Sequence, residues 1–308
     1  MTTTTSYPPL TAMHKPISTA PEAFGLLEPA TDVADNPAAL RERMARDGYL
    51  YLPGYLDRDE VLGVRRVMVE RLAAAGHLEP EQPPMAAKAR RGSRLAFQPD
   101  LAFDNPKAMQ LLYSGRMMAF WELFFGAPVR HYDFTWVRAV APGRGTPPHM
   151  DIVYMGRGTQ QLFTTWTPLG DVPLSIGGLM ILEQSHRHQR LNEGYGSKDV
   201  DAYCENKVGP GFTRMGGGGN ITDGGWLSKD PVKLRANLGG RWLSADYRAG
   251  DLLAFSVFTV HASLDNASDE IRFSTDTRYQ LASDPIDERW VGEHPIGHGP
   301  DGKKGMIC

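Results

Sequence analysis

Hydrophobic and polar positions follow a helical period in the first part of the chain and a strand period in the second. After Asn36-Pro37, Leu40 and Met44 recur at helical spacing and Gly48 closes the segment. A second apolar stripe runs from Val61 to Leu72, behind a capping box-like Asp57-x-x-Glu60. A third helical region is expected at about 105–126. Tyr49–Leu52 and, beyond about residue 129, most of the remaining segments alternate or form short apolar runs. They predict strands at about 131–140, 160–168, 177–183, 241–247, 251–260 and 270–281.

This order of elements predicts a mainly β fold with flanking α-helices, in which strands form a sandwich or barrel and the helices pack outside it. Residues 36–290 are expected to form a single domain. Residues 1–35 are rich in Thr, Pro and Ala without periodicity, which predicts a poorly ordered N-terminal arm. Residues 291–308 are expected to form a C-terminal tail.

A glycine-rich insertion lies at about 190–240 and contains the run Gly216–Gly219. We expect it to form a lid over the mouth of the β core, because long loops carry function more often than packing. The alternative is a disordered insertion with no role. A phosphate-binding loop is disfavoured, since no Lys-Ser/Thr follows the glycines.

Composition narrows the class of partner. The chain has 308 residues, 22% of them charged, and a formal net charge of −3, which gives no reason to expect binding to nucleic acid or to a membrane surface. The two cysteines, Cys204 and Cys308, argue against a disulfide framework, and no apolar stretch reaches the roughly 18 residues of a membrane span. We therefore expect a cytoplasmic protein with a small-molecule partner. The oligomeric state is not encoded in these features.

Three residues are candidate metal ligands. In His149-Met150-Asp151, two ligand types stand two positions apart, which places both on one side of an extended segment. A surface histidine after Pro147-Pro148 is the alternative. His261 follows the apolar run Leu252–Val260, and a histidine at the end of a buried strand needs polar partners or a metal. Structural zinc is disfavoured, because such sites usually recruit cysteine.

A polar face follows His261. On the predicted strand at 270–281, alternate positions carry Arg272, Ser274, Asp276, Arg278 and Gln280. Such a face points either to solvent or into a polar interior. In the second case, Arg272 and Ser274 could bind a dicarboxylate beside the metal.

Several motifs together resemble the phytanoyl-CoA dioxygenase family. They are His149-x-Asp151, Gly250-Asp251, His261-Ala-Ser263-x-x-Asn266-x-Ser268-x-x-x-Arg272, the segment Asp47–Leu56, Trp166-Thr-Pro-Leu169, Gly177–Leu182 and Ser185-His186. The resemblance spans roughly residues 36–285. Two departures are Gln184, where the family commonly has glycine, and the long glycine-rich segment. The resemblance implies no particular substrate.

The resemblance implies a double-stranded β-helix (a jelly-roll, cupin-like core) and an iron(II)- and 2-oxoglutarate-dependent dioxygenase. It implies that His149, Asp151 and His261 bind Fe(II) and act in catalysis, and that Arg272 binds the far carboxylate of 2-oxoglutarate, helped by Ser263 and Ser274. Three ligands on one face leave room for a bidentate 2-oxo acid and O₂.

The substrate side of the site is predicted from sequence neighbours of the metal ligands and from the strand that precedes them. These residues are Met150, Tyr154, Trp136 and Arg138. The expected reaction is hydroxylation of a small molecule, with desaturation, cyclisation or epimerisation left open. The alternative function is a non-catalytic jelly-roll protein that binds a ligand or a metal. The three ligand types and Arg272 argue against a silent ligand-binding protein, and a metal-storing or zinc cupin would need no Arg-x-Ser after the last histidine.

Overall fold

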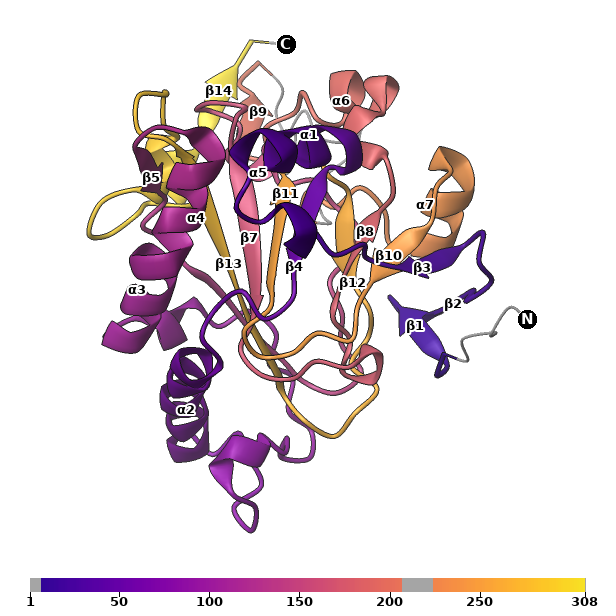
Figure 1. Cartoon of the computed structure of the whole chain (residues 1–308), viewed down its shortest axis with the longest axis vertical. Helices are drawn as coiled ribbons and strands as arrows, with labels where there is room; N and C mark the ends of the chain where they lie inside the picture. Colours follow the sequence, from indigo (N-terminus) through magenta and orange to yellow (C-terminus); the bar gives the residue numbers. More distant parts are fainter. Residues whose placement is uncertain (1–6, 207–223, 308) are drawn as a thin grey trace.

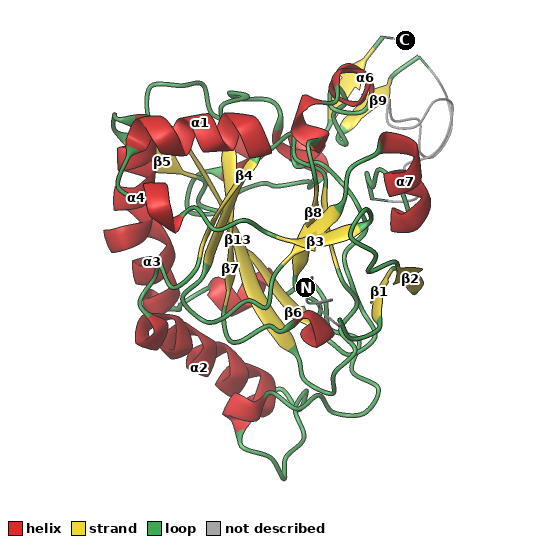
Figure 2. Ribbon diagram, turned by 45° about the vertical axis from the view of Figure 1, so that its right-hand side comes forward, coloured by secondary structure: helices red, strands yellow, loops and turns green. Residues whose placement is uncertain are grey.

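The structure is a computed structural model that describes residues 7–206 and 224–307. Two β-sheets face each other, and helices cover the outer face of the larger sheet (Figures 1 and 2). The helices of the described part are α1 (Pro37–Asp47), α2 (Arg58–Ala74), α3 (Pro106–Tyr113), α4 (Gly115–Phe125), α5 (Ile152–Met155), α6 (Gln189–Gly194) and α7 (Pro231–Leu238).

The larger sheet has the order β4-β11-β7-β13-β5, with β6 also paired to β13. Its strands are β4 (Tyr49–Leu52), β11 (Leu252–Ser256), β7 (Phe163–Pro168), β13 (Arg272–Leu281), β5 (Val129–His131) and β6 (Trp136–Val140). The smaller sheet has the order β12-β8-β10-β3, with β12 (His261–Ser263), β8 (Leu179–Leu182), β10 (Trp242–Ser244) and β3 (Phe24–Leu26). Two open sheets face each other, so the sandwich form of the expected fold is the one observed.

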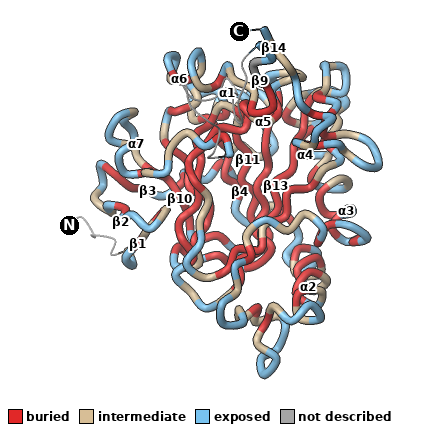
Figure 3. The backbone as a smooth tube through the Cα atoms, turned by 180° about the vertical axis from the view of Figure 1, so that it is seen from behind, coloured by how far each residue is buried: buried red, intermediate tan, exposed pale blue. Residues whose placement is uncertain are grey.

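Two of the three hydrophobic clusters among the described residues show how the layers are held together. Between the sheets, Trp166 and Phe255 of the larger sheet pack with Ile181 of the smaller one. On the outer face, strand residues such as Phe273 pack with helix residues such as Trp121. Figure 3 shows that the buried residues are concentrated in these central layers. Successive side chains of a strand point to opposite faces of the sheet, so one strand contributes side chains to both clusters.

The helix boundaries confirm the predicted caps. The Asn36 side chain accepts a hydrogen bond from Ala39 N at 3.1 Å, and that of Asp57 accepts one from Glu60 N at 2.9 Å. The region expected to be helical at 105–126 is divided into α3 and α4 at Ser114. Gly115, with φ +53°, allows the sharp change of direction there.

The prediction of a poorly ordered N-terminal arm differs from the structure. Within it, β1 (Leu10–Ala12) and β2 (Lys15–Ile17) form a hairpin, and β3 pairs in parallel with β10. Phe24 of β3 is buried and packs against Tyr7 with ring centroids 5.2 Å apart. Three-residue strands are too short to produce a visible period, which is why the pattern did not reveal them.

The insertion at 190–240 contains ordered elements at both ends. These are α6, β9 (Ala202–Cys204) and α7. β9 pairs in parallel with β14 (Lys304–Met306), so the expected C-terminal tail also carries a strand. The Gly216–Gly219 run and Phe212 lie outside the described residues, and the lid expected there therefore stays a prediction. No helix in the described part of the chain is long and apolar enough to cross a membrane.

Candidate active site

His149, Asp151 and His261 converge on one point. One ligand atom from each lies within 4.8 Å of the others, and both imidazole Nε2 atoms are 3.7 Å from Asp151 Oδ1. All three side chains are buried. The convergence follows from the backbone, because His149 N donates to His261 O and His261 N donates to His149 O, each at 3.0 Å. The three residues identified in the sequence are thus brought together.

Each imidazole is oriented by a backbone carbonyl. His149 Nδ1 lies 2.8 Å from Pro147 O, and His261 Nδ1 lies 3.0 Å from Thr259 O. A carbonyl can only accept a hydrogen bond, so Nδ1 carries the proton and Nε2 keeps a lone pair for a metal. Burial, with the proximity of His261, lowers the pKa of His149 to about 3. Burial also lowers the pKa of His261. Both rings are therefore neutral, as ligands must be.

Asp151 is held through its second oxygen. Oδ2 accepts hydrogen bonds from Thr164 Oγ1 at 2.6 Å and Arg278 Nη2 at 2.8 Å. Burial alone would raise the pKa of the Asp151 carboxyl, but the charge of Arg278 and the other neighbours outweigh it, and the pKa lies well below its usual range. The carboxylate is therefore ionised, with Oδ1 directed toward the two histidines. This arrangement favours ligation of a metal by one oxygen.

A small cavity adjoins the histidines. Its lining includes both of them together with Arg138, Ser263, Arg272 and Asp276. Arg272 is 2% exposed, and its guanidinium donates to Gly177 O, while Nε has no partner among the described residues. Burial lowers the pKa of Arg272 to about 10, which leaves it charged at neutral pH. The lining of the cavity thus includes a buried cation.

Two hydroxyl groups accompany Arg272. Ser274, two positions along β13, is fully buried, and its Oγ finds no partner in the part of the chain that the structure describes. Ser263 Oγ accepts a hydrogen bond from Thr146 N at 2.8 Å and lines the cavity, where its own proton remains available. An orphaned buried polar group next to a cation is what a cavity for a carboxylate requires.

Comparison with known proteins decides the family. The sequence model of the phytanoyl-CoA dioxygenase family matches residues 44–274. The chain belongs to this family. It is also similar to a 1-deoxypentalenic acid 11-beta-hydroxylase of Streptomyces arenae, with 29% identity over 269 residues, which cover 82% of this chain and 86% of the relative. The chain is accordingly a dioxygenase.

Two solved structures show the fold. The carbocyclase SnoK of nogalamycin biosynthesis has a TM-score of 0.58 and 18% identity, covering 87% of this chain and 92% of its own. The epimerase SnoN of the same biosynthesis has a TM-score of 0.53 and 22% identity, covering 86% and 96%. Both are described as non-heme and alpha-ketoglutarate-dependent. The jelly-roll fold implied by the family motifs is thereby confirmed.

The expected substrate-side residues are divided by the structure. Arg138 lines the same cavity as Arg272 and forms an ion pair with Asp276, with Nε 2.9 Å from Oδ2. Met150 is fully buried in an apolar cluster. Tyr154 meets the His149 ring edge-on, with centroids 5.6 Å apart, and Trp136 lies against Arg278. Of the four residues, only Arg138 lines the cavity that contains Arg272.

Sequence reasoning missed two positioning residues. Arg278 appeared only as one more member of the polar face, and the same period that placed Arg272 inside also placed Arg278 there. Thr164 carries no signal, because a threonine in a buried strand is usually a packing residue. Both were found only through their hydrogen bonds to Asp151.

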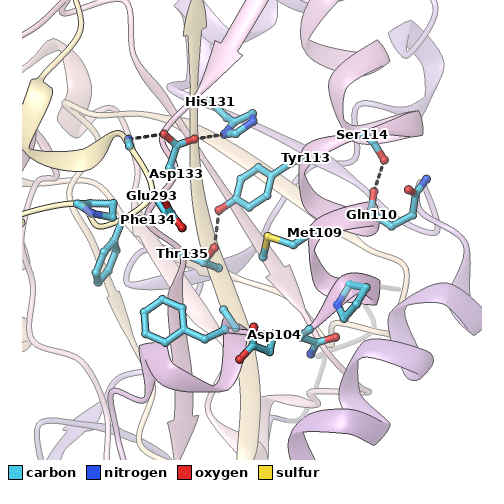
Figure 4. A pocket seen from close by; sticks show the side chains of 16 residues that line it. Asp104, Met109, Gln110, Tyr113, Ser114, His131, Asp133, Phe134, Thr135 and Glu293 are labelled. Carbon is cyan, nitrogen blue, oxygen red and sulfur yellow. Dashed lines mark hydrogen bonds and ion pairs between the residues drawn. The ribbon is translucent and has the colours of Figure 1, made fainter.

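A separate groove of about 980 Å³ lies between α3 and the segment at 131–135 (Figure 4). On it, Tyr113 Oη lies 2.5 Å from Thr135 Oγ1, and His131 Nδ1 lies 3.4 Å from Asp133 Oδ1. Its lining includes none of the three candidate metal ligands. The groove is therefore distinct from the candidate metal site.

Proposed function

We propose that this family member is an iron(II)- and 2-oxoglutarate-dependent hydroxylase in which His149, Asp151 and His261 bind the iron. One observation carries the proposal: two neutral imidazole Nε2 atoms and one carboxylate oxygen face a common point beside a cavity that Arg272 helps to line. Two histidines and one carboxylate on one face suit non-heme Fe(II), because positions stay open for other ligands. The donor set therefore fits the metal.

The residues of the cavity also fit 2-oxoglutarate. The guanidinium of Arg272 would hold the far carboxylate, and the unpartnered hydroxyl of Ser274 would donate to it. Ser263 would supply a further hydroxyl from β12. The buried Arg272, which forms no ion pair among the described residues, then gains one with this carboxylate. Arg138 and Asp276 would form the side wall and neutralise each other.

When bound, iron and 2-oxoglutarate supply the oxidation of a C–H bond by O₂, with release of succinate and CO₂. The protein's residues position these groups. The carbonyls of Pro147 and Thr259 fix the imidazole rings, and Thr164 with Arg278 fixes the carboxylate. Burial of all three ligands excludes water from the centre.

The substrate in this proposal is a small molecule. The Streptomyces relatives are named as hydroxylases of 1-deoxypentalenic acid, and hydroxylation is the outcome we assign to this chain. Tyr154 and Trp136 would line the substrate side, the first next to the ring of His149 and the second along the wall behind Asp151. Met150, buried in the core, would act through packing.

Binding experiments without oxygen test the function before a substrate is known. Apo protein should bind one Fe(II), and the loaded protein should bind 2-oxoglutarate with the visible charge-transfer band of a chelated 2-oxo acid. His261→Ala should abolish iron binding and the band, while a variant of an exposed histidine, His294→Ala, should retain both. Tight 2-oxoglutarate binding that does not depend on Fe(II) would contradict the proposal.

A further inference from the structure

Arg278 is buried with most of its hydrogen-bonding capacity unused. Its side chain is 2% exposed, and among the described residues only its Nη2 donates a hydrogen bond, to Asp151 Oδ2. Nε and Nη1, which carry three of the five guanidinium N–H donors, have no partner among residues 7–206 and 224–307. Buried donors of a charged group are seldom left unpaired. This group is therefore prepared for a ligand.

The wall around Arg278 is aromatic. Its guanidinium carbon lies 4.0 Å from the centroid of the Trp136 ring. Trp136 in turn packs on Trp290, with centroids 4.8 Å apart, and Trp290 Nε1 is a second buried donor that lacks a partner within the described chain. Arg278 and Trp290, which both pack against Trp136, thus each carry an unpaired donor. Such a wall suits a ligand with an apolar body and an acceptor group.

The net charge of the site with iron and 2-oxoglutarate bound indicates the charge of the ligand's acceptor group. Arg138 and Asp276 cancel, Arg278 and Asp151 cancel, and each histidine donates its Nδ1 proton to a backbone carbonyl and leaves Nε2 as a neutral ligand atom. Arg272 and a divalent iron then supply three positive charges against the two negative charges of 2-oxoglutarate. One positive charge remains in a buried site, where low dielectric strengthens its attraction for an anion.

We propose that Arg278 anchors a carboxylate of the substrate through its unused N–H groups, so that the enzyme selects monoanionic, otherwise apolar small molecules. The inference rests on the proposed function, because it places this anion beside a loaded metal centre. It deepens that function by assigning the chemical class of the substrate. Arg278 would then contact both Asp151 and the substrate carboxylate. The same guanidinium would orient the substrate relative to Asp151.

Matched probes test the anchor. The full-length protein is loaded with Fe(II) and saturating 2-oxoglutarate under anaerobic conditions, which occupies Arg272. Two pairs of probes, adamantane-1-carboxylate with its carboxamide and cyclohexanecarboxylate with its carboxamide, are then titrated by following the charge-transfer band and by calorimetry. We expect the carboxylate to bind at least tenfold more tightly than the amide in at least one pair. Equal or undetectable binding of both members in both pairs overturns the inference.

Variants separate the anchor from the support of Asp151. Thr164→Val removes the other hydrogen bond to Asp151 Oδ2, so it should weaken iron binding and keep the preference for carboxylate. Arg278→Gln should lose that preference, and Arg278→Lys should keep part of it because the charge remains. Retention of the full preference in Arg278→Gln overturns the inference.

A further variant covers the case in which Arg278→Gln does not hold iron. Trp290→Phe keeps the aromatic packing and removes Nε1, and it should reduce carboxylate affinity severalfold without changing iron or 2-oxoglutarate binding. The inference is also overturned if Trp290→Phe binds the carboxylate as tightly as the unmodified protein does and the unmodified protein does not prefer carboxylate over carboxamide. Failure of the parent to bind Fe(II) or 2-oxoglutarate would instead overturn the proposed function.

Discussion

His149 and His261 are a backbone pair in which each peptide N–H donates to the carbonyl of the other at 3.0 Å. The ring centroids lie 4.2 Å apart as a result. Their separation is therefore set by main-chain hydrogen bonds, which a side-chain substitution nearby does not remove. The third ligand depends on side chains instead, because Asp151 is held by Thr164 and Arg278.

Asp151→Ala should abolish iron binding and also destabilise the protein. Loss of the carboxylate leaves Arg278 as an uncompensated buried cation, and breaking a buried ion pair typically costs about 3–5 kcal/mol. His261→Ala should abolish iron binding without stranding a charge. Chemical denaturation of both apo variants measures the difference. Equal stability of the two would show that Arg278 finds another partner.

Arg272→Lys should weaken 2-oxoglutarate binding by about tenfold or more and leave iron affinity nearly unchanged. A lysine cannot reproduce the two parallel hydrogen bonds of a guanidinium, and one charge-assisted hydrogen bond is worth about 1.5–3 kcal/mol. Ser274→Ala should have a smaller effect in the same direction. Titration of the Fe(II)-loaded protein with 2-oxoglutarate gives both constants. An unchanged constant for Arg272→Lys would mean that this residue is not the anchor.

Docking of the C-terminal strand should weaken in acid. Asp201 is buried and contacts His298 at 2.7 Å, Lys303 at 2.6 Å and Arg289 at 2.6 Å. Burial alone would raise the pKa of its carboxyl, but the hydrogen bonds to His298 and Lys303 hold it well below the usual range. A depressed carboxyl pKa contributes stability above the unfolded value, about 3.9, and that stability is lost as the pH falls through the folded value.

Hydrogen exchange of β14 as a function of pH measures this effect. The parent should protect β14 at neutral pH and progressively less below about pH 4. Asp201→Asn should show weak protection at every pH. Asp171→Asn is the control, because its pair with Arg58 is exposed and such pairs contribute about 1 kcal/mol or less. Full protection of β14 in Asp201→Asn would show that the charge cluster does not hold the strand.

Phe24→Ala tests whether the N-terminal segment is docked. Phe24 is 2% exposed, and truncation of a buried phenylalanine costs about 3–5 kcal/mol. Leu26→Ala on the same strand should cost about 0.5 kcal/mol or less, because Leu26 is 51% exposed. The free energies of unfolding of both variants give the answer. A loss at Phe24 no larger than at Leu26 would restore the expectation of a loose arm.

Elements that are long enough to show a periodic pattern of hydrophobic and polar residues could be predicted from the sequence. The polar face of β13 is an example, since Arg272, Ser274, Asp276, Arg278 and Gln280 are all buried as an interior face requires. β3 and β9 were not predicted, because each has three residues and gains its stability from a partner strand far away in the sequence. Pairing between distant strands is not encoded in any local window.

The candidate site divides in the same way. Residue type and spacing were enough to predict His149, Asp151 and His261, because only a few kinds of side chain bind metals. The side of the pocket on which Arg138 lies could not be predicted, since its partner Asp276 belongs to a strand far along the chain. The role of Thr164 could not be predicted either, because it depends on the hydrogen bond from its hydroxyl to Asp151.

The candidate ligands are supported by different sheets. The histidines are tied to β12 of the smaller sheet, whereas Asp151 is tied to β7 and β13 of the larger one. An ion bound by all three would act as a cross-link between the two halves of the sandwich. Because a ligand that binds only the folded state stabilises it by mass action, chelation would loosen the joint between the sheets as well as remove the reactive centre.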